Sequence, residues 1–133
     1  MTVRGVRGAT TADENSRSAI LNATSELLKE IVDRNDISVD DIASVLFTTT
    51  ADLNAEFPAA AARDIGWKHV ALMCGHEMSV PEAQARCIRV MLLINTNKFY
   101  STVSNSPSLS AIRSINMLIS LSISISSWYI WLC

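Results

Sequence analysis

The sequence predicts a mixed α/β domain. Apolar, β-branched segments alternate with helical segments along the first 98 residues, and the longest helical segment has one apolar face. A chain of 133 residues has room for one core of this kind. Its 11 Lys/Arg and 13 Asp/Glu residues form no basic stripe, which argues against nucleic acid as a partner.

The chain begins with a predicted strand and a predicted helix. Residues 2–8 form the strand, with Arg4 and Arg7 on opposite faces because side chains alternate along a strand. Apolar residues then recur at helical spacing from Ala19 to Val32, and Thr11-x-x-Glu14 matches a capping box that would start this helix.

Three further strands and one short helix follow. The apolar and β-branched content predicts strands over residues 44–50, 69–73 and 87–94. A short helix is expected over residues 57–63, because Pro58 stands where the first helical turn tolerates proline.

Residues 99–133 have a different composition. Only Arg113 is charged in this segment, which contains eleven Ser. Three interpretations compete: a membrane segment over residues 115–133, a strand over the alternating residues 119–126, or non-native sequence from a shifted reading frame. Frequent Ser and the lack of a basic flank disfavour the membrane. We favour the third interpretation for a reason given below.

The cysteines and histidines predict neither a metal site nor a disulfide framework. Cys74, Cys87 and Cys133 are an odd, sparse set, and residues 1–8 lack the apolar stretch of a secretory signal, so a reducing cytoplasm is expected. Cys74, His76 and Glu77 are too crowded for a complete tetrahedral site. A Cys74/His76 nucleophilic pair is disfavoured for the same crowding, and no phosphate-binding loop is present. The sequence therefore predicts no cofactor.

Three arginines are candidate ligand-binding residues. Arg89 lies in an apolar strand, where a guanidinium is costly unless an anion or a carboxylate satisfies it. That partner is either a ligand or an acid of this chain, such as Glu77 or Asp64. Arg7 lies on a Gly-flanked strand, and Arg63 ends a helix, where the helix dipole favours a cation. Without a ligand, both are ordinary solvated residues.

Several separated motifs resemble the monofunctional AroH-type chorismate mutases over residues 1 to about 98. They are Arg4-Gly-Val-Arg-Gly-Ala-Thr-Thr11, Asp52-Leu-Asn-Ala-Glu-Phe-Pro58, Arg63, Gly66-Trp67, Cys74-x-x-Glu77-Met78 and Cys87-Ile-Arg-Val-Met91. The resemblance implies an α+β fold with helices on one side of a mixed sheet, assembled as a homotrimeric pseudo-α/β-barrel. It also implies the conversion of chorismate to prephenate in phenylalanine and tyrosine biosynthesis, without cofactor or metal.

The resemblance assigns roles by position. It implies that Arg7 binds a substrate carboxylate and that Arg89 meets the ether oxygen whose bond breaks. Glu77 and the Cys74 region, with Met73 beside it, would hold the substrate hydroxyl. Phe57 and Arg63 would come from the adjoining subunit. Arg7, Glu77 and Arg89 are thus the expected catalytic residues.

The sequence also departs from that family. Ala60 stands where the family usually carries Lys, and residues 99–133 lack its His-x-Tyr-Leu and Leu-Arg-Pro segments. We therefore expect a mutase-like domain over residues 1–98, a frameshifted tail over residues 99–133, and impaired activity. The alternatives are a non-catalytic trimeric protein that binds small carboxylates and a tail-anchored membrane protein.

Overall fold

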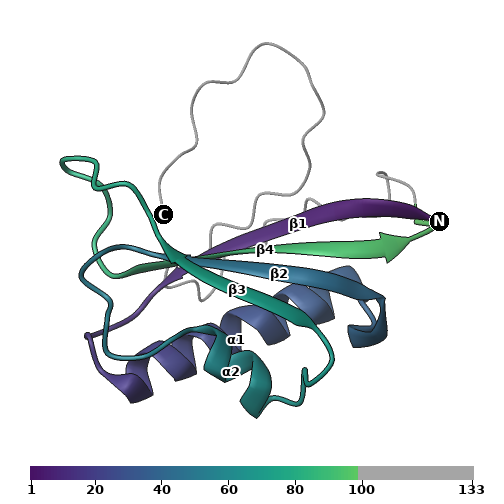
Figure 1. The fold of residues 1–133 in the computed structure, drawn as a ribbon, viewed down its shortest axis with the longest axis horizontal. Coiled ribbons are helices and arrows are strands. Elements are labelled where there is room, and N and C mark those ends of the chain that lie inside the picture. Colours follow the sequence, from purple (N-terminus) through teal and green to yellow (C-terminus); the bar gives the residue numbers. More distant parts are fainter. Residues whose placement is uncertain (99–133) are drawn as a thin grey trace, which may run out of the picture.

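The computed structural model describes residues 1–98, which form a four-stranded mixed sheet and two α-helices (Figure 1). The elements are β1 (Thr2–Thr11), α1 (Arg17–Asn35), a 3₁₀ turn η1 (Val39–Asp41), β2 (Ile42–Thr49), α2 (Ala59–Asp64), β3 (Ala71–His76) and β4 (Cys87–Thr96). The predicted mixed sheet is confirmed. All interpretations of residues 99–133 lie outside the described residues.

The strand order in the sheet is β1-β4-β2-β3. β4 pairs antiparallel with β1 on one side and with β2 on the other, whereas β2 and β3 are parallel. A parallel pair needs a crossover connection, and α2 provides it between β2 and β3.

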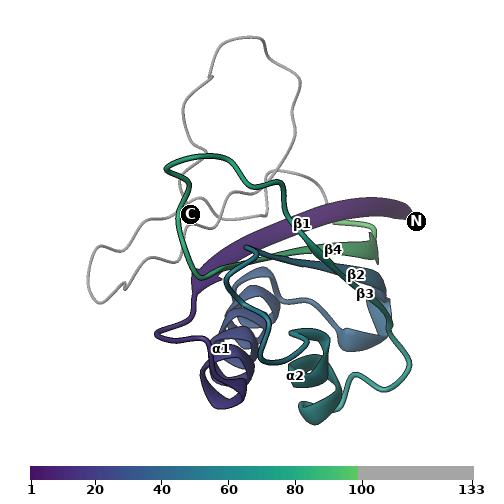
Figure 2. The ribbon, with the colours of Figure 1, turned by 60° about the vertical axis from the view of Figure 1, so that its left-hand side comes forward.

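Both helices cover the same face of the sheet (Figures 1 and 2). The core between them is aliphatic and includes Val6, Leu27, Leu28, Ile31, Val45, Phe47, Val90 and Leu92, all buried. The opposite face has no covering element within residues 1–98 (Figure 2). Neither helix in this part of the chain has both the length and the apolarity to cross a bilayer.

β4 alternates as the sequence predicts. Ile88, Val90, Leu92 and Ile94 are buried toward the helices, and Met91 and Leu93 are exposed on the open face. Arg89 shares that open face. Both edges of β4 are paired, one with β1 and the other with β2.

Two local predictions are wrong. Thr11 is the last residue of β1, and the N-cap of α1 is Ser16, whose hydroxyl accepts a hydrogen bond from the Ala19 amide. The capping-box pattern of Thr11 and Glu14 therefore does not start the helix. The third strand runs from Ala71 to His76 rather than over residues 69–73, because its register with β2 runs from Ser44–Ala71 to Thr49–His76.

Candidate active site

An ion pair between Arg89 and Glu77 lies on the open sheet face, near the start of β4. The Glu77 amide donates to the Thr49 carbonyl over 2.9 Å, which carries the β2–β3 pairing one residue beyond β3. Glu77 therefore lies beside Thr48, whose hydroxyl donates to Glu77 Oε1 over 2.5 Å. Thr48 is also the cross-strand partner of Arg89, and Arg89 Nη1 contacts Glu77 Oε2.

Burial shifts the pKa of the arginine in this ion pair without removing its charge. The two side chains are only 26% and 20% exposed, and desolvation lowers the pKa of the Arg89 guanidinium. An arginine still carries its charge at neutral pH, because its ordinary pKa is so high. The sequence analysis offers two acids as partners of Arg89, and the one that forms the ion pair is Glu77. Asp64 ends α2, on the helix-covered side.

The Arg89 guanidinium retains capacity for a ligand. A guanidinium has five N–H donors. Within residues 1–98, the ion pair with Glu77 uses the Nη1 nitrogen of Arg89. One oxygen of Glu77 is held by Thr48, so the carboxylate is fixed while it orients the guanidinium. A guanidinium held in this way can present further donors to an oxygen atom that lies above the sheet.

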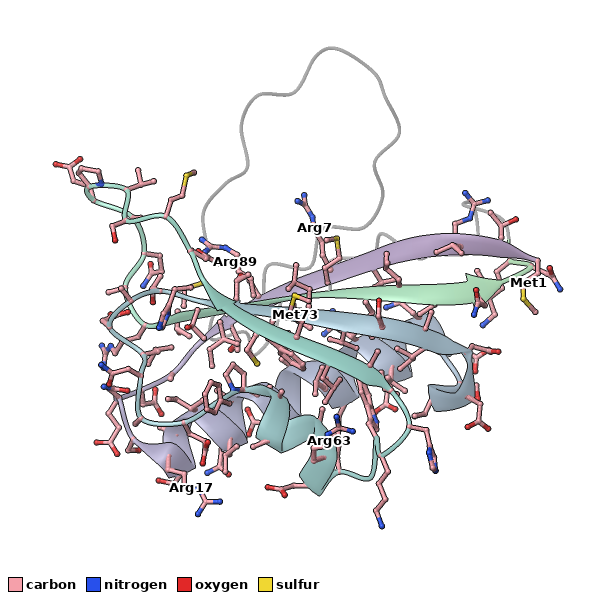
Figure 3. All side chains as sticks on the ribbon, in the orientation of Figure 1. Met1, Arg7, Arg17, Arg63, Met73 and Arg89 are labelled. Atoms are coloured by element: carbon pink, nitrogen blue, oxygen red, sulfur yellow. The ribbon has the colours of Figure 1, made fainter. Side chains whose placement is uncertain are left out.

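Arg7 projects from the same face as Arg89 (Figure 3). In the β1–β4 register, Ala9 lies opposite Arg89 and Arg7 opposite Met91. Arg7 and Arg89 are therefore diagonal neighbours on an antiparallel pair, whose backbones lie about 7–8 Å apart. Two long cationic side chains that start from such positions on one face can reach two anionic groups of one small molecule.

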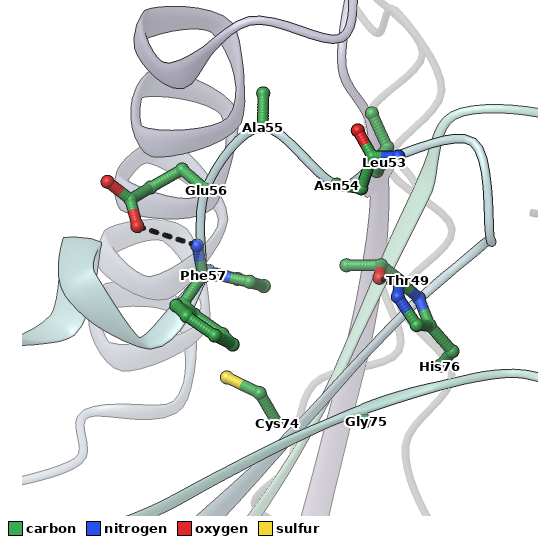
Figure 4. Close-up of a pocket in the computed structure, with 10 residues that line it drawn as sticks. Thr49, Leu53, Asn54, Ala55, Glu56, Phe57, Cys74, Gly75 and His76 are labelled. Atoms are coloured by element: carbon green, nitrogen blue, oxygen red, sulfur yellow. Dashed lines mark hydrogen bonds between the residues drawn. The ribbon is translucent and has the colours of Figure 1, made fainter.

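A second group of predicted site residues lines a cleft of about 350 Å³ beside α2 (Figure 4). Phe57 faces Cys74 across this cleft, and His76 and Thr49 lie on its far side. Cys74 packs against the core, and burial raises the pKa of its thiol, so the thiol is protonated at neutral pH. His76 Nδ1 and Thr49 Oγ1 are hydrogen-bonded at 3.0 Å. Nothing here favours a Cys74/His76 nucleophilic pair.

Arg63 and Met73 complete the set. Arg63 Nη1 donates to the carbonyls of Trp67 at 3.3 Å and Lys68 at 3.0 Å, and its side chain lies on the side of the sheet opposite Arg7 and Arg89 (Figure 3). Met73 lies on the open face in the cross-strand row of Leu46, Met91 and Arg7. One chain therefore brings Arg7, Met73, Glu77 and Arg89 to one face, and Phe57, Arg63 and Cys74 to the other.

Sequence reasoning missed Thr48. Its hydroxyl fixes Glu77, yet it stands in a Thr-Thr-Thr run whose β-branched residues favour a strand without further meaning. The signal that identifies it is cross-strand register, since Thr48 lies opposite Arg89. No pattern within a single segment carries that information.

An α/β domain with two guanidinium groups and a fixed carboxylate on one open sheet face has the chemistry of a protein that binds small organic anions. Comparison with known proteins gives the family. The model of the family "Chorismate mutase type I" matches residues 3–107, slightly beyond the residue at which the predicted resemblance ends. The chain belongs to this family, whose members are isomerases of aromatic amino acid biosynthesis.

Individual relatives agree with the family assignment. Chorismate mutase AroH of Bacillus subtilis is 40% identical over 98 residues, which cover 73% of this chain and 77% of the relative. Chorismate mutase AroH of Thermus thermophilus is 47% identical over 96 residues, or 71% and 79% of the two chains. The solved chorismate mutase from Clostridium thermocellum superposes with a TM-score of 0.73 at 46% identity, covering 75% of this chain and 89% of that one. The predicted family and activity are confirmed.

Proposed function

We propose that this chain rearranges chorismate to prephenate at a site shared by two neighbouring copies of a homotrimer. Arg7, Glu77 and Arg89 come from one copy, together with Met73 and the β3 backbone at Cys74, and Phe57 and Arg63 come from the next. The observation that carries this proposal is the placement of Arg7, Glu77 and Arg89 on one open sheet face.

The chemistry needs only these residue types. The rearrangement is unimolecular, so no nucleophile, metal or cofactor takes part, and the protein must select one compact shape of a flexible dianion. Negative charge grows on the ether oxygen as its C–O bond opens, and a fixed guanidinium at Arg89 stabilises that charge in the transition state. Arg7 binds a carboxylate, and Glu77 accepts a hydrogen bond from the substrate hydroxyl.

The ion pair fits this role. Glu77 holds Arg89 before substrate arrives, so little reorganisation is needed during the reaction. The Arg89 charge is also compensated in the free enzyme, which makes a partly buried guanidinium tolerable on an apolar strand. A structural ion pair and a catalytic cation are thus compatible functions of the same contact.

Two features support a shared site. The open face exposes Val3, Met73, Met91 and Leu93, and an apolar sheet face of this kind favours a protein partner. Arg63 lies on the far side of the sheet from Arg89 (Figure 3). Phe57 is 70% exposed and faces Cys74, which packs against the core on that same far side (Figure 4). A neighbouring copy can supply these two residues to the Arg89 side, whereas the same chain cannot.

The test combines activity and assembly. The purified chain should form prephenate from chorismate, and light scattering should give the mass of three chains. Leu93→Asp should yield monomers without mutase activity, whereas Val80→Asp, an equally apolar exposed residue in the loop before β4, should leave both unchanged. An active monomer contradicts the shared site. Substrate binding without turnover in the wild type favours the non-catalytic carboxylate-binding protein.

The proposal extends to the domain organisation. Residues 1–98 form the mutase domain that acts in the cytoplasm, and residues 99–133 are read from a shifted frame. A downstream nucleotide sequence that encodes His-x-Tyr-Leu and Leu-Arg-Pro in another frame would establish this. Activity of the 133-residue chain equal to that of an enzyme with the restored C-terminus would contradict the expected impairment.

A further inference from the structure

We propose that Asn15 is a positioning residue that holds residues 54–56 and thereby sets the place of the Phe57 ring in the active site. This inference rests on the proposed function, in which Phe57 contacts substrate bound to the neighbouring copy. Asn15 is not among the residues that line the cleft, so it acts through Phe57.

Asn15 joins two loops that are distant in sequence. It lies between β1 and α1, and its side-chain oxygen accepts hydrogen bonds from the amides of Asn54 and Ala55, both at 3.0 Å. Its side-chain nitrogen donates to the side-chain oxygen of Asn54 over 2.8 Å. One amide group thus makes three bonds to the segment just before Phe57.

Glu56 continues this connection to Phe57. Its Oε2 atom forms an ion pair with Arg17 Nε at 2.9 Å, and its Oε1 atom accepts a hydrogen bond from the Phe57 amide over 2.8 Å. Arg17 is the first residue of α1 and follows Asn15 by two positions. Asn15 and Arg17 therefore hold three consecutive residues, 54–56, and Glu56 accepts the hydrogen bond of the Phe57 amide.

The segment needs such polar contacts because it lacks apolar anchors of its own. Leu53 before it and Pro58 after it are buried, but Asn54, Ala55 and Phe57 between them are exposed. The Phe57 ring faces Cys74 across the cleft (Figure 4). The position of the ring therefore depends on the backbone between Leu53 and Pro58, to which Asn15 is bonded at Asn54 and Ala55.

A double-mutant cycle tests this inference. Asn15→Ala in the wild type should raise KM about tenfold, with kcat changed less than about twofold, because the lost bonds hold a binding contact. In a Phe57→Ala background, the same substitution should change KM less than about twofold, because residues that act through one another are not additive. Asn15→Asp keeps the acceptor for both backbone amides and should retain near-wild-type KM. Asn22→Ala is the matched control, since Asn22 is exposed on α1 and makes no side-chain hydrogen bond within residues 1–98.

Amide hydrogen exchange provides a readout that does not depend on turnover. Asn15→Ala should lose protection at Ala55 and Phe57, while Asn22→Ala should not. Multiplicative KM effects in the cycle, or unchanged protection, would overturn the inference. A wild type that forms no prephenate refutes the proposed function, and exchange then decides whether Asn15 holds the loop.

Discussion

The two faces of the sheet differ in how far one chain completes them. On the helix-covered face, Phe47, Leu92 and their neighbours are fully buried against α1 and α2. On the open face, Met91 and Leu93 remain 44% and 38% exposed, although they alternate along β4 with fully buried residues. The open face also carries the two guanidinium groups.

This difference separates stability from function along the same strands. The helix side gains its free energy from aliphatic burial within one chain. The open side keeps a partly desolvated ion pair and exposed apolar groups, which contribute little until a partner or substrate covers them. Arg89 belongs to the ion pair on the open face, whereas its neighbour Val90 is buried in the core. The two differ because a strand presents alternate residues to opposite faces.

The largest expected effect is on the helix side. Phe47→Ala should lower the free energy of unfolding by about 3–5 kcal/mol, because it leaves a cavity in a closed core. Met91→Ala, on the neighbouring strand but on the open face, should cost less than about 1 kcal/mol at concentrations where the chain is monomeric. Urea unfolding measures both. Equal losses would mean that the two faces do not differ as described.

Arg89→Lys should have the largest effect on the open side. Lysine keeps the charge and the Glu77 ion pair but loses the planar fork, so kcat should fall about 10²–10³-fold with stability nearly unchanged. The control is Arg34→Lys, which alters an exposed i,i+4 pair with Glu30 on α1. Steady-state kinetics and thermal unfolding decide. Turnover above a tenth of wild type would remove Arg89 from the mechanism.

Much of the helix side could be predicted from the sequence. The period-two pattern of β4 identifies its buried residues, and the 3.6-residue stripe of α1 identifies Ile20, Leu27, Leu28 and Ile31. The limits of elements were harder to predict. Thr11 and Ser16 are both good cap residues, and only strand pairing between Thr11 and Cys87 excludes the first.

The site could be predicted only in part. Arg89 is identifiable because a cation interrupts an apolar strand. Arg7 and Glu77 are candidates from the sequence as well, but only the family resemblance gives them roles. That Arg7 and Arg89 share a face depends on the β1–β4 register, which no single segment encodes. The placement of Arg63 on the opposite side likewise follows from the α2 crossover.

The N-cap of α1 tests where local sequence pattern and tertiary structure disagree, because the pattern predicts Thr11 and the structure has Ser16. Ser16→Ala should lower the free energy of unfolding by about 0.5–2 kcal/mol, because the Ala19 amide loses its acceptor. Glu14→Ala should stay within about 0.5 kcal/mol, since Glu14 is exposed and does not cap the helix. Chemical denaturation of both variants distinguishes the two caps. A larger loss for Glu14→Ala would restore the capping box.

The smallest expected effect lies at the other end of α1. Lys98 Nζ donates to Asp36 Oδ2 at 2.9 Å and to the Asp36 carbonyl at 2.6 Å, and Asp36 is the αL residue that ends the helix. The hydrogen bond and charge of Lys98 lower the pKa of the Asp36 carboxyl below its ordinary value. A carboxyl whose pKa is depressed by folding stabilises the native state above its unfolded pKa and loses that contribution as pH falls through its folded pKa.

Lys98→Met should therefore lower the melting temperature slightly at pH 7 and remove part of the decline below about pH 4, where Asp36 takes up its proton. High salt should reduce the difference between wild type and variant, because both groups are exposed. Lys29→Met, which removes an exposed charge from the middle of α1, should leave the acid-side slope unchanged. Melting curves from pH 7 to 2 provide the measurement, and identical slopes for wild type and Lys98→Met would show that this contact does not contribute to stability.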